Sequence, residues 1–197
     1  MKNAFCEPVT LRGDHLTLEP LSTEHDHALR LAASDGELWK LWYTTVPKPE
    51  AMRQEIELRL ALHSSGSMLP FAMRRSDDAR ICGMTTYMHI DADNRRVEIG
   101  STWLAASAQR TGINTEAKLL LLAHAFEALG CIAVEFRTHW LNHQSRSAIL
   151  RLGAKQDGVL RSHSRMPDGT LRDTAVYSII DSEWPAVKRH LHHLLER

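Results

Sequence analysis

The sequence predicts a mixed α/β domain with elements in the order ββααβββαβαββα. Three observations indicate this class. Runs such as "CIAVEFRTH" alternate apolar and polar residues, as strands do. Other runs carry apolar residues three or four positions apart, as helices do, and turn-forming segments separate the two kinds. At 197 residues, with 43% hydrophobic and 24% charged residues, the chain is long enough for one sizeable core, so we expect a single domain over residues 1–197.

The first half of the chain is expected to hold a hairpin, two helices and three strands. "VTLRGDHLTLEPL" indicates two strands joined by a Gly13–Asp14 turn. Ser22 and Thr23 can cap a helix that runs to about Ser34, and a second helix follows the prolines of "VPKPEAMRQEIELRLALHSSG". Three antiparallel strands then occupy residues 69–104, because turn-rich segments divide this part of the chain into three.

The second half begins with "GINTEAKLLLLAHAFEALG", a run of good helix formers that is apolar almost all round and therefore predicts a buried helix. A strand follows in "CIAVEFRTH", and then a helix in "NHQSRSAILRLGA", with Asn142 as N-cap and Gly153 as stop. Two strands, at about Lys155–Arg165 and Leu171–Ile180, are joined by the hairpin signal "MPDGT". The tail "DSEWPAVKRHLHHLLER" indicates a last helix.

Composition and charge exclude several classes of function. Lysine and arginine together number 24, as do aspartate and glutamate, so no global field favours nucleic acid or an anionic membrane as a partner. No window approaches 18 uninterrupted apolar residues, and the N-terminal residues lack the apolar region of a signal peptide. The three cysteines are odd in number and far apart, which favours reduced thiols in the cytoplasm. The twelve histidines do not have metal-ligand spacing, so we expect no metal.

The loop from Gln109 to Asn114 stands directly before the buried helix. The first N–H groups of a helix lack partners, and that end carries about half a positive charge, which favours an anion such as phosphate. Gly112 is expected to permit a positive φ and a close approach of the backbone, and Arg110 adds a cation. A surface turn that merely precedes a helix is the alternative. The loop matches neither the GxGxxG nor the GK[ST] nucleotide motif.

The pattern Gln109-x-x-Gly112-x-Asn114 resembles the Q/R-x-x-G-x-G/A signature of the GNAT superfamily of N-acetyltransferases. "LRGDHLTLEPL", "EIGSTWL", "NHQSRSAILRLGA" and "DGTLRDTAVYSIIDSEW" follow the order of its Rim-type branch, named for ribosomal-protein acetyltransferases, over nearly the whole chain. The resemblance implies a mostly antiparallel, twisted sheet of about seven strands, flanked by helices and splayed in the middle to admit acetyl-CoA. Asn114 departs from the usual Gly or Ala, and we expect a slightly altered loop because Asn tolerates left-handed backbone.

The resemblance also implies which residues bind acetyl-CoA. The strand over Val97–Leu104 holds the pantetheine arm through its backbone, with Trp103 and Leu104 near the loop. Asn142 is expected to bind the cofactor; the alternative is that it is only an N-cap. The pyrophosphate lies on the loop and the first helical turn, formed by Gln109, Arg110, Thr111, Gly112, Ile113, Asn114 and Thr115.

Two residues are candidates for the chemistry of acetyl transfer. Glu98 matches an acidic position that Rim-type enzymes use as general base, commonly through water; the alternative is a strand glutamate paired with arginine or lysine. Ser145 is placed to protonate the CoA thiolate or to order a water, or it is an ordinary polar residue of a first helical turn. The tyrosine that many GNAT enzymes use as the acid is absent between Asn142 and Gly153.

The acceptor is expected to meet the aromatic cluster of "GELWKLWYTT", in which Trp39, Trp42 and Tyr43 either wall a pocket or form core beneath a loop. Arginines around the late hairpin either attract a carboxylated acceptor or are solvated. The sequence thus predicts direct acetyl transfer from acetyl-CoA to a primary amine of a small or amino-acid-like molecule. The alternatives are a protein N-terminus as acceptor, or a non-catalytic CoA-binding sensor. A homodimer is possible, and the sequence does not identify the acceptor.

Overall fold

The structure is a computed structural model that describes residues 4–196. Its strands are β1 (Leu11–Arg12), β2 (Leu16–Pro20), β3 (Met68–Arg75), β4 (Ile81–Asp91), β5 (Arg96–Leu104), β6 (Ala133–His139), β7 (Lys155–Arg165) and β8 (Leu171–Ile180). Its α-helices are α1 (Asp26–Ser34), α2 (Met52–Ser64), α3 (Ile113–Ala123), α4 (His143–Arg151) and α5 (Trp184–Leu195). The order of elements is the one predicted from the sequence.

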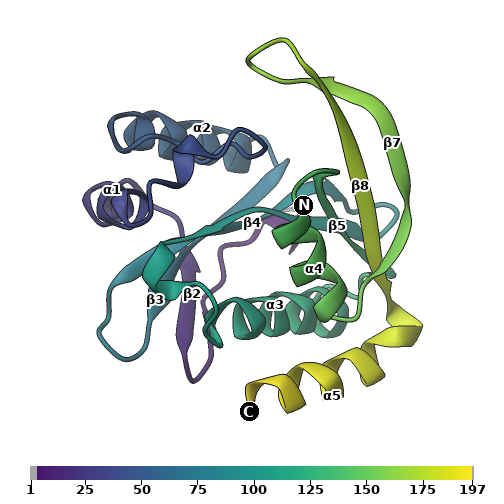
Figure 1. Cartoon of the computed structure of the whole chain (residues 1–197). Coiled ribbons are helices and arrows are strands. Elements are labelled where there is room, and N and C mark those ends of the chain that lie inside the picture. The colour runs from purple at the N-terminus through teal and green to yellow at the C-terminus, as the bar shows by residue number, and fades with distance from the viewer. Residues whose placement is uncertain (1–3, 197) are drawn as a thin grey trace.

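All eight strands form one sheet in the order β1-β2-β3-β4-β5-β6-β8-β7. Every neighbouring pair is antiparallel except β5 and β6, which are parallel. The predicted fold class is therefore confirmed, with eight strands rather than about seven because the two residues of β1 count as a strand. Figure 1 shows that β7 and β8 form a long hairpin whose tip extends away from the helices.

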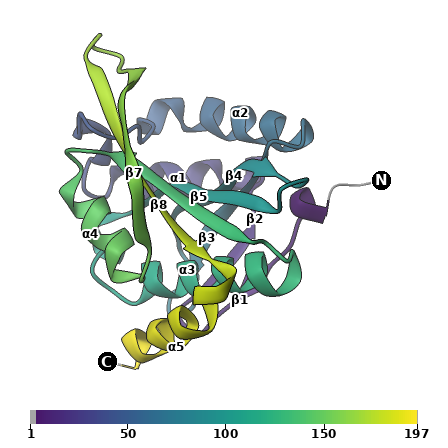
Figure 2. The same ribbon diagram turned by 90° about the vertical axis from the view of Figure 1, so that its right-hand side faces the viewer.

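Helices cover both faces of the sheet. The hydroxyl of Tyr87 in β4 donates to the carbonyl of Leu121 in α3, whereas the hydroxyl of the preceding residue, Thr86, accepts from Arg59 of α2 at 2.6 Å. Because successive side chains of a strand point to opposite faces, α2 and α3 lie on opposite sides of β4. Figures 1 and 2 show the same arrangement, with α1 and α2 on one side and α3 and α5 on the other.

The core fills the space between the sheet and these two helical layers. Its largest fully buried side chains are Tyr87, Tyr177, Phe71 and Phe136, one from each of four strands. Strand alternation, register and ring contacts place all four on the α3 face, and because burial of a large apolar side chain stabilises the fold by about 1.5–3 kcal/mol, they hold that helical layer to the sheet. Within the described residues, no helix is long and apolar enough to cross a membrane.

The sheet divides in its middle, between β5 and β6. The two strands pair only where Arg96–Glu98 faces Ala133–Glu135. Beyond that point β5 continues beside β4 to Leu104, while β6 continues beside β8 to His139. A register shift in β5 accompanies Ser101, whose φ is +47°. The predicted splay therefore begins directly after Glu98.

Candidate active site

The loop before α3 presents several unpaired backbone donors. Helix α3 begins at Ile113, and its first internal hydrogen bond runs from the Glu116 N–H to the Gly112 carbonyl at 2.9 Å. Within residues 4–196, no hydrogen bond engages the N–H groups of Arg110, Thr111, Gly112, Asn114 and Thr115. These donors, together with the positive end of the helix dipole, make the loop suitable for an anion.

The positive φ predicted for Gly112 is wrong. Gly112 has a φ of −64°, and the left-handed residue is Arg110, with φ +60°. A Cβ at Gly112 would lie 3.3 Å from the His15 ring, which is slightly tight, and 3.5 Å from Leu195, which is ordinary contact. Asn114 does not use its tolerance of left-handed backbone, since it lies in the first turn of α3.

Side chains fix the shape of the loop from within. The Gln109 amide donates to the Leu104 carbonyl at 3.0 Å, which ties the loop to the end of β5. Thr111 donates to the Ala108 carbonyl at 2.8 Å, and its hydroxyl accepts from the N–H of Ile113 at 3.3 Å. The Thr115 hydroxyl accepts from Arg151 of α4 at 3.0 Å, so it is engaged in joining two helices.

Glu116 attaches α3 to the N-terminal hairpin. Its buried carboxylate accepts three backbone N–H groups, those of Asp14, His15 and Leu16, at 2.7–2.9 Å. Gly13 leaves the necessary room, because a Cβ there would lie 2.4 Å from the carboxyl carbon. Hydrogen bonds to a charged group are stronger than neutral ones, so this contact positions the start of α3 firmly.

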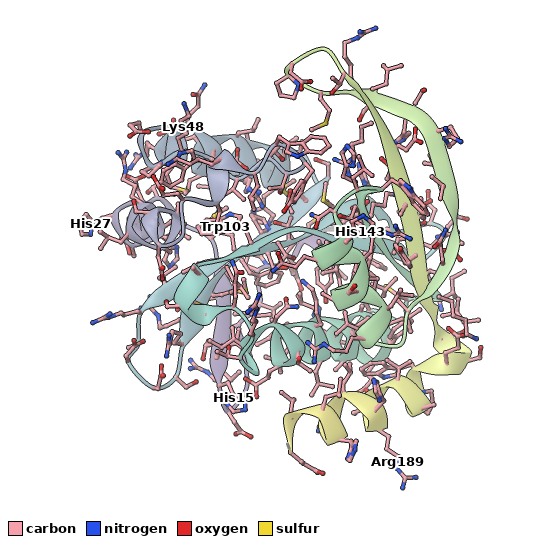
Figure 3. All side chains as sticks on the ribbon, viewed as in Figure 1. His15, His27, Lys48, Trp103, His143 and Arg189 are labelled. Atoms are coloured by element: carbon pink, nitrogen blue, oxygen red, sulfur yellow. The ribbon has the colours of Figure 1, made fainter. Side chains whose placement is uncertain are left out.

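The end of β5 lies beside the loop, as predicted for Trp103 and Leu104. Both side chains are buried, and Trp103 lies toward α1 and α2 (Figure 3). Its indole Nε1 is the buried side-chain nitrogen that has no hydrogen-bond partner among residues 4–196. Such a group is rare in native proteins, so Trp103 is compatible with a polar ligand atom nearby.

The first turn of α4 approaches the same loop. Figure 3 marks this turn by His143, and the Gln144 amide lies 3.4 Å from the Gln109 oxygen. Asn142 is the N-cap, since its oxygen accepts from the Ser145 N–H at 3.0 Å. The Asn142 amide nitrogen and the Ser145 hydroxyl have no hydrogen-bond partner within the described residues. Capping and cofactor binding are thus compatible, and the second role stays a prediction.

Glu98 lies at the point where the sheet divides. Its side chain is 6% exposed, and one oxygen is 2.7 Å from Nδ1 of His89 and 3.5 Å from Nε of Arg137. The alternative considered for this residue, an ion pair with arginine, is therefore present in the structure. Its role as a general base remains a prediction.

Of the three aromatic residues predicted to meet the acceptor, Trp42 is the one that contacts His139 at the end of β6. The ring of Trp42 packs edge-on against His139, at the end of β6, with centroids 5.2 Å apart, and against Tyr43 at 5.6 Å. Trp42 is 56% exposed, whereas Trp39 takes no part in these ring contacts. The sequence did not predict His139 as a residue of the site. Its Nδ1 accepts from the Leu141 N–H, and burial together with Arg172 lowers the pKa of the ring.

A second unpredicted residue is Lys118 of α3, which is buried at 5% exposure. Its Nζ donates to Thr102 of β5 at 2.7 Å and lies 3.4 Å from the hydroxyl of Thr85 in β4. Within residues 4–196 no carboxylate pairs with it. Burial therefore lowers the pKa of Lys118 from 10.5 to about 7. The residues around Lys118 in the sequence predicted an apolar helix and gave no sign that this lysine is buried without a carboxylate.

In the part of the chain that the structure describes, no three histidine, cysteine, aspartate or glutamate side chains gather as a metal site would require.

Comparisons with known proteins agree with this geometry. Residues 15–155 match the model of the Acetyltransferase (GNAT) domain. YdaF of Bacillus subtilis (strain 168), provisionally named a ribosomal N-acetyltransferase, is 32% identical over 111 residues, which are 56% of this chain and 60% of YdaF. The match thus spans less than two thirds of that relative.

Two solved structures are similar over nearly their whole length. A provisionally assigned acetyltransferase from T. thermophilus has a TM-score of 0.83 and 34% identity, covering 95% of this chain and 97% of its own. RimJ of Mycobacterium smegmatis, solved in complex with CoA-disulfide, has a TM-score of 0.80 and covers 96% of each chain. At 22% identity, this second likeness is one of fold.

Proposed function

This chain belongs to the GNAT family of acetyltransferases, and from that premise we propose that it transfers an acetyl group from acetyl-CoA directly to a primary amine of a small, amino-acid-like molecule. The observation that carries the proposal is the opening of the sheet after Glu98, bordered by unpaired donors of the loop, β5 and α4.

Acetyl-CoA is bound, in this proposal, along the opening between β5 and β6. The pyrophosphate accepts hydrogen bonds from the backbone of residues 110–115, and the exposed Arg110 side chain adds a cation. The pantetheine arm pairs with the free edge of β5 beyond Glu98, near Trp103. The amide nitrogen of Asn142 donates to the arm while its oxygen continues to cap α4. The RimJ neighbour was itself solved with a CoA derivative.

Glu98 accepts the proton of the acceptor amine, directly or through a water. An alkylamine with a pKa near ~10 is mostly charged at neutral pH, so it must lose a proton before it attacks the thioester. The contact between Glu98 and His89 provides an exit, because the His89 side chain is 62% exposed. The amine then attacks the thioester carbon and the carbon–sulfur bond breaks. The Ser145 hydroxyl protonates the departing thiolate and takes the second proton of the amine nitrogen in return, so that the products are the amide and the free CoA thiol.

The first experiment separates binding from turnover. Acetyl-CoA at 100 times its Kd should stabilise the native protein by about 2.7 kcal/mol, which a thermal-shift measurement detects. A thiol-release assay with amines, amino acids and short peptides then reports transfer. No shift in melting temperature would contradict the proposal, and a shift without turnover of any amine would indicate the sensor function instead.

A protein N-terminus is the second candidate acceptor, and one observation favours it. The relative YdaF is named for acetylation of ribosomal protein, and the Rim-type resemblance of this chain points the same way. The same assay distinguishes the two. Faster turnover of N-terminal peptides than of any free amino acid would favour the protein acceptor.

A further inference from the structure

Arg172 lies on the same face of the sheet as Glu98. In the register of the sheet Glu98 faces Glu135, and His139, four residues further along β6, faces Thr174 of β8. Side chains two and four positions apart in a strand share a face, so Arg172, two residues before Thr174, belongs to this face as well. Three neighbouring strands thus bring Glu98, His139 and Arg172 to one surface.

The guanidinium of Arg172 differs from those of its neighbours. Arg96 and Arg137 pair with Glu135, and Arg161 pairs with Asp173. Within residues 4–196, no carboxylate forms an ion pair with Arg172, whose Nε donates only to the Thr174 hydroxyl at 3.1 Å. Its two terminal nitrogens are thus left without a protein partner in that part of the chain.

Partial burial raises the cost of leaving this charge unpaired. The Arg172 side chain is partly withdrawn from water, which lowers its pKa, and the charge of Glu98 offsets part of that shift. Arg172 in turn lowers the pKa of His139, so the charges act on one another across the face. A buried cation is normally paired, and a guanidinium with both terminal nitrogens free has the geometry for a bidentate carboxylate.

We propose that Arg172 binds a carboxylate of the acceptor and thereby directs the amine of that molecule toward Glu98. The inference rests on the proposed acetyl transfer and narrows its substrate class to amines that carry a carboxylate, as free amino acids do. In this proposal Trp42, which packs on His139 and is 56% exposed, lies along the acceptor between its carboxylate, at Arg172, and its amine, at Glu98.

The test compares acceptors that differ only in this carboxylate. Each amino acid of a panel is assayed beside its carboxamide with saturating acetyl-CoA, and the ratio of the two kcat/KM values is the readout. In the wild-type protein the acid should be preferred by roughly 10- to 100-fold, the range expected for a charge-assisted pair. Arg172→Gln should reduce the ratio to about one, mainly through KM, with little change for the amide. Arg172→Lys should retain part of the preference.

Arg165→Gln is the matched control. Arg165 lies in the same hairpin, also lacks an ion pair among the described residues, and is exposed, so its removal should leave the ratio unchanged. Equal wild-type rates for acids and amides, a panel in which no acid is acetylated, or an equal loss with Arg165→Gln would overturn the inference.

A further comparison determines whether the carboxylate belongs to a free amino acid or to an acidic side chain of a peptide. Peptides with Glu at the second position are compared with their Gln counterparts, and turnover confined to the acidic peptides would overturn the free amino acid as substrate. If the proposed function is wrong, the result is different: either acetyl-CoA gives no thermal shift, or no amine of any kind is acetylated. Failure of this inference leaves that shift and the turnover of amines intact.

Discussion

Replacing Lys118 by methionine should remove a pH dependence from the stability of the protein. Lys118 is buried without a carboxylate, and its pKa of about 7 lies well below the 10.5 of an exposed lysine. Between these two values the unfolded chain binds the proton and the folded chain does not, so the free energy of unfolding rises with pH. Below pH 7 both states hold the proton, and the full cost of the buried charge is present.

The magnitude follows from the two pKa values. Each pH unit between them changes the free energy of unfolding by up to about 1.4 kcal/mol. From pH 7 to pH 9.5 this amounts to about 3 kcal/mol, because Lys118 is already half deprotonated at pH 7. Methionine has a similar length and leaves the Thr85–Thr102 hydrogen bond of 2.8 Å intact, so the substitution orphans no hydroxyl.

Urea unfolding followed by circular dichroism at half-unit steps from pH 6 to pH 9.5 gives the two curves. Their difference, Lys118→Met minus wild type, should be largest at pH 6 and should fall by about 3 kcal/mol by pH 9.5. Lys155→Met is the control, since Lys155 is 76% exposed and its removal should leave a nearly flat difference. Parallel curves for wild type and Lys118→Met would refute the assigned pKa.

Three further predictions concern the proposed site. Glu98→Gln should lower kcat by roughly 10²-fold or more without changing the affinity for acetyl-CoA. An unchanged rate and pH profile would show that Glu98 is not the general base and serves only in an ion pair. Asn142→Ala should lower the free energy of unfolding by about 0.5–2 kcal/mol through loss of the cap, and it should also weaken acetyl-CoA binding. Ser145→Ala should lower turnover alone. Normal kinetics in both folded variants would show that Asn142 acts only as a cap. Arg110→Gly should raise the free energy of unfolding of the ligand-free protein by up to about 1 kcal/mol, because glycine adopts left-handed backbone without the strain of arginine. It should also reduce the thermal shift with acetyl-CoA. A shift equal to that of the wild type would exclude Arg110 from the site.

Local features of the fold were predictable because their causes lie close together in sequence. The cap at Asn142 depends on a backbone N–H three residues away, and the turn within "MPDGT" depends on its own glycine. Alternation and turn residues predicted all the strands, and the ordered motifs predicted the family, which the match over residues 15–155 confirms.

Long-range features were predicted less well. The surroundings of Gly112 include His15 and Leu195, which come from nearly opposite ends of the chain, so its local sequence does not reveal them. The two threonines that lie within hydrogen-bond distance of buried Lys118 come from different strands, and nothing in the helix itself distinguishes this residue from a solvated lysine. The group formed by Glu98, His139 and Arg172 exists only once the register of the sheet is known.

The contact of Glu116 with the N-terminal hairpin has a consequence for the order in which the protein is made. The three N–H groups that its carboxylate accepts precede it by 100–102 residues. At a synthesis rate of about 5–20 residues per second, those donors remain bonded to water for about 5–20 s before the carboxylate is added. Contacts of such separation form late in folding, because the intervening chain must first be ordered. We therefore expect the attachment of α3 to the N-terminal hairpin, and with it the final position of the loop before α3, to be among the later contacts to form.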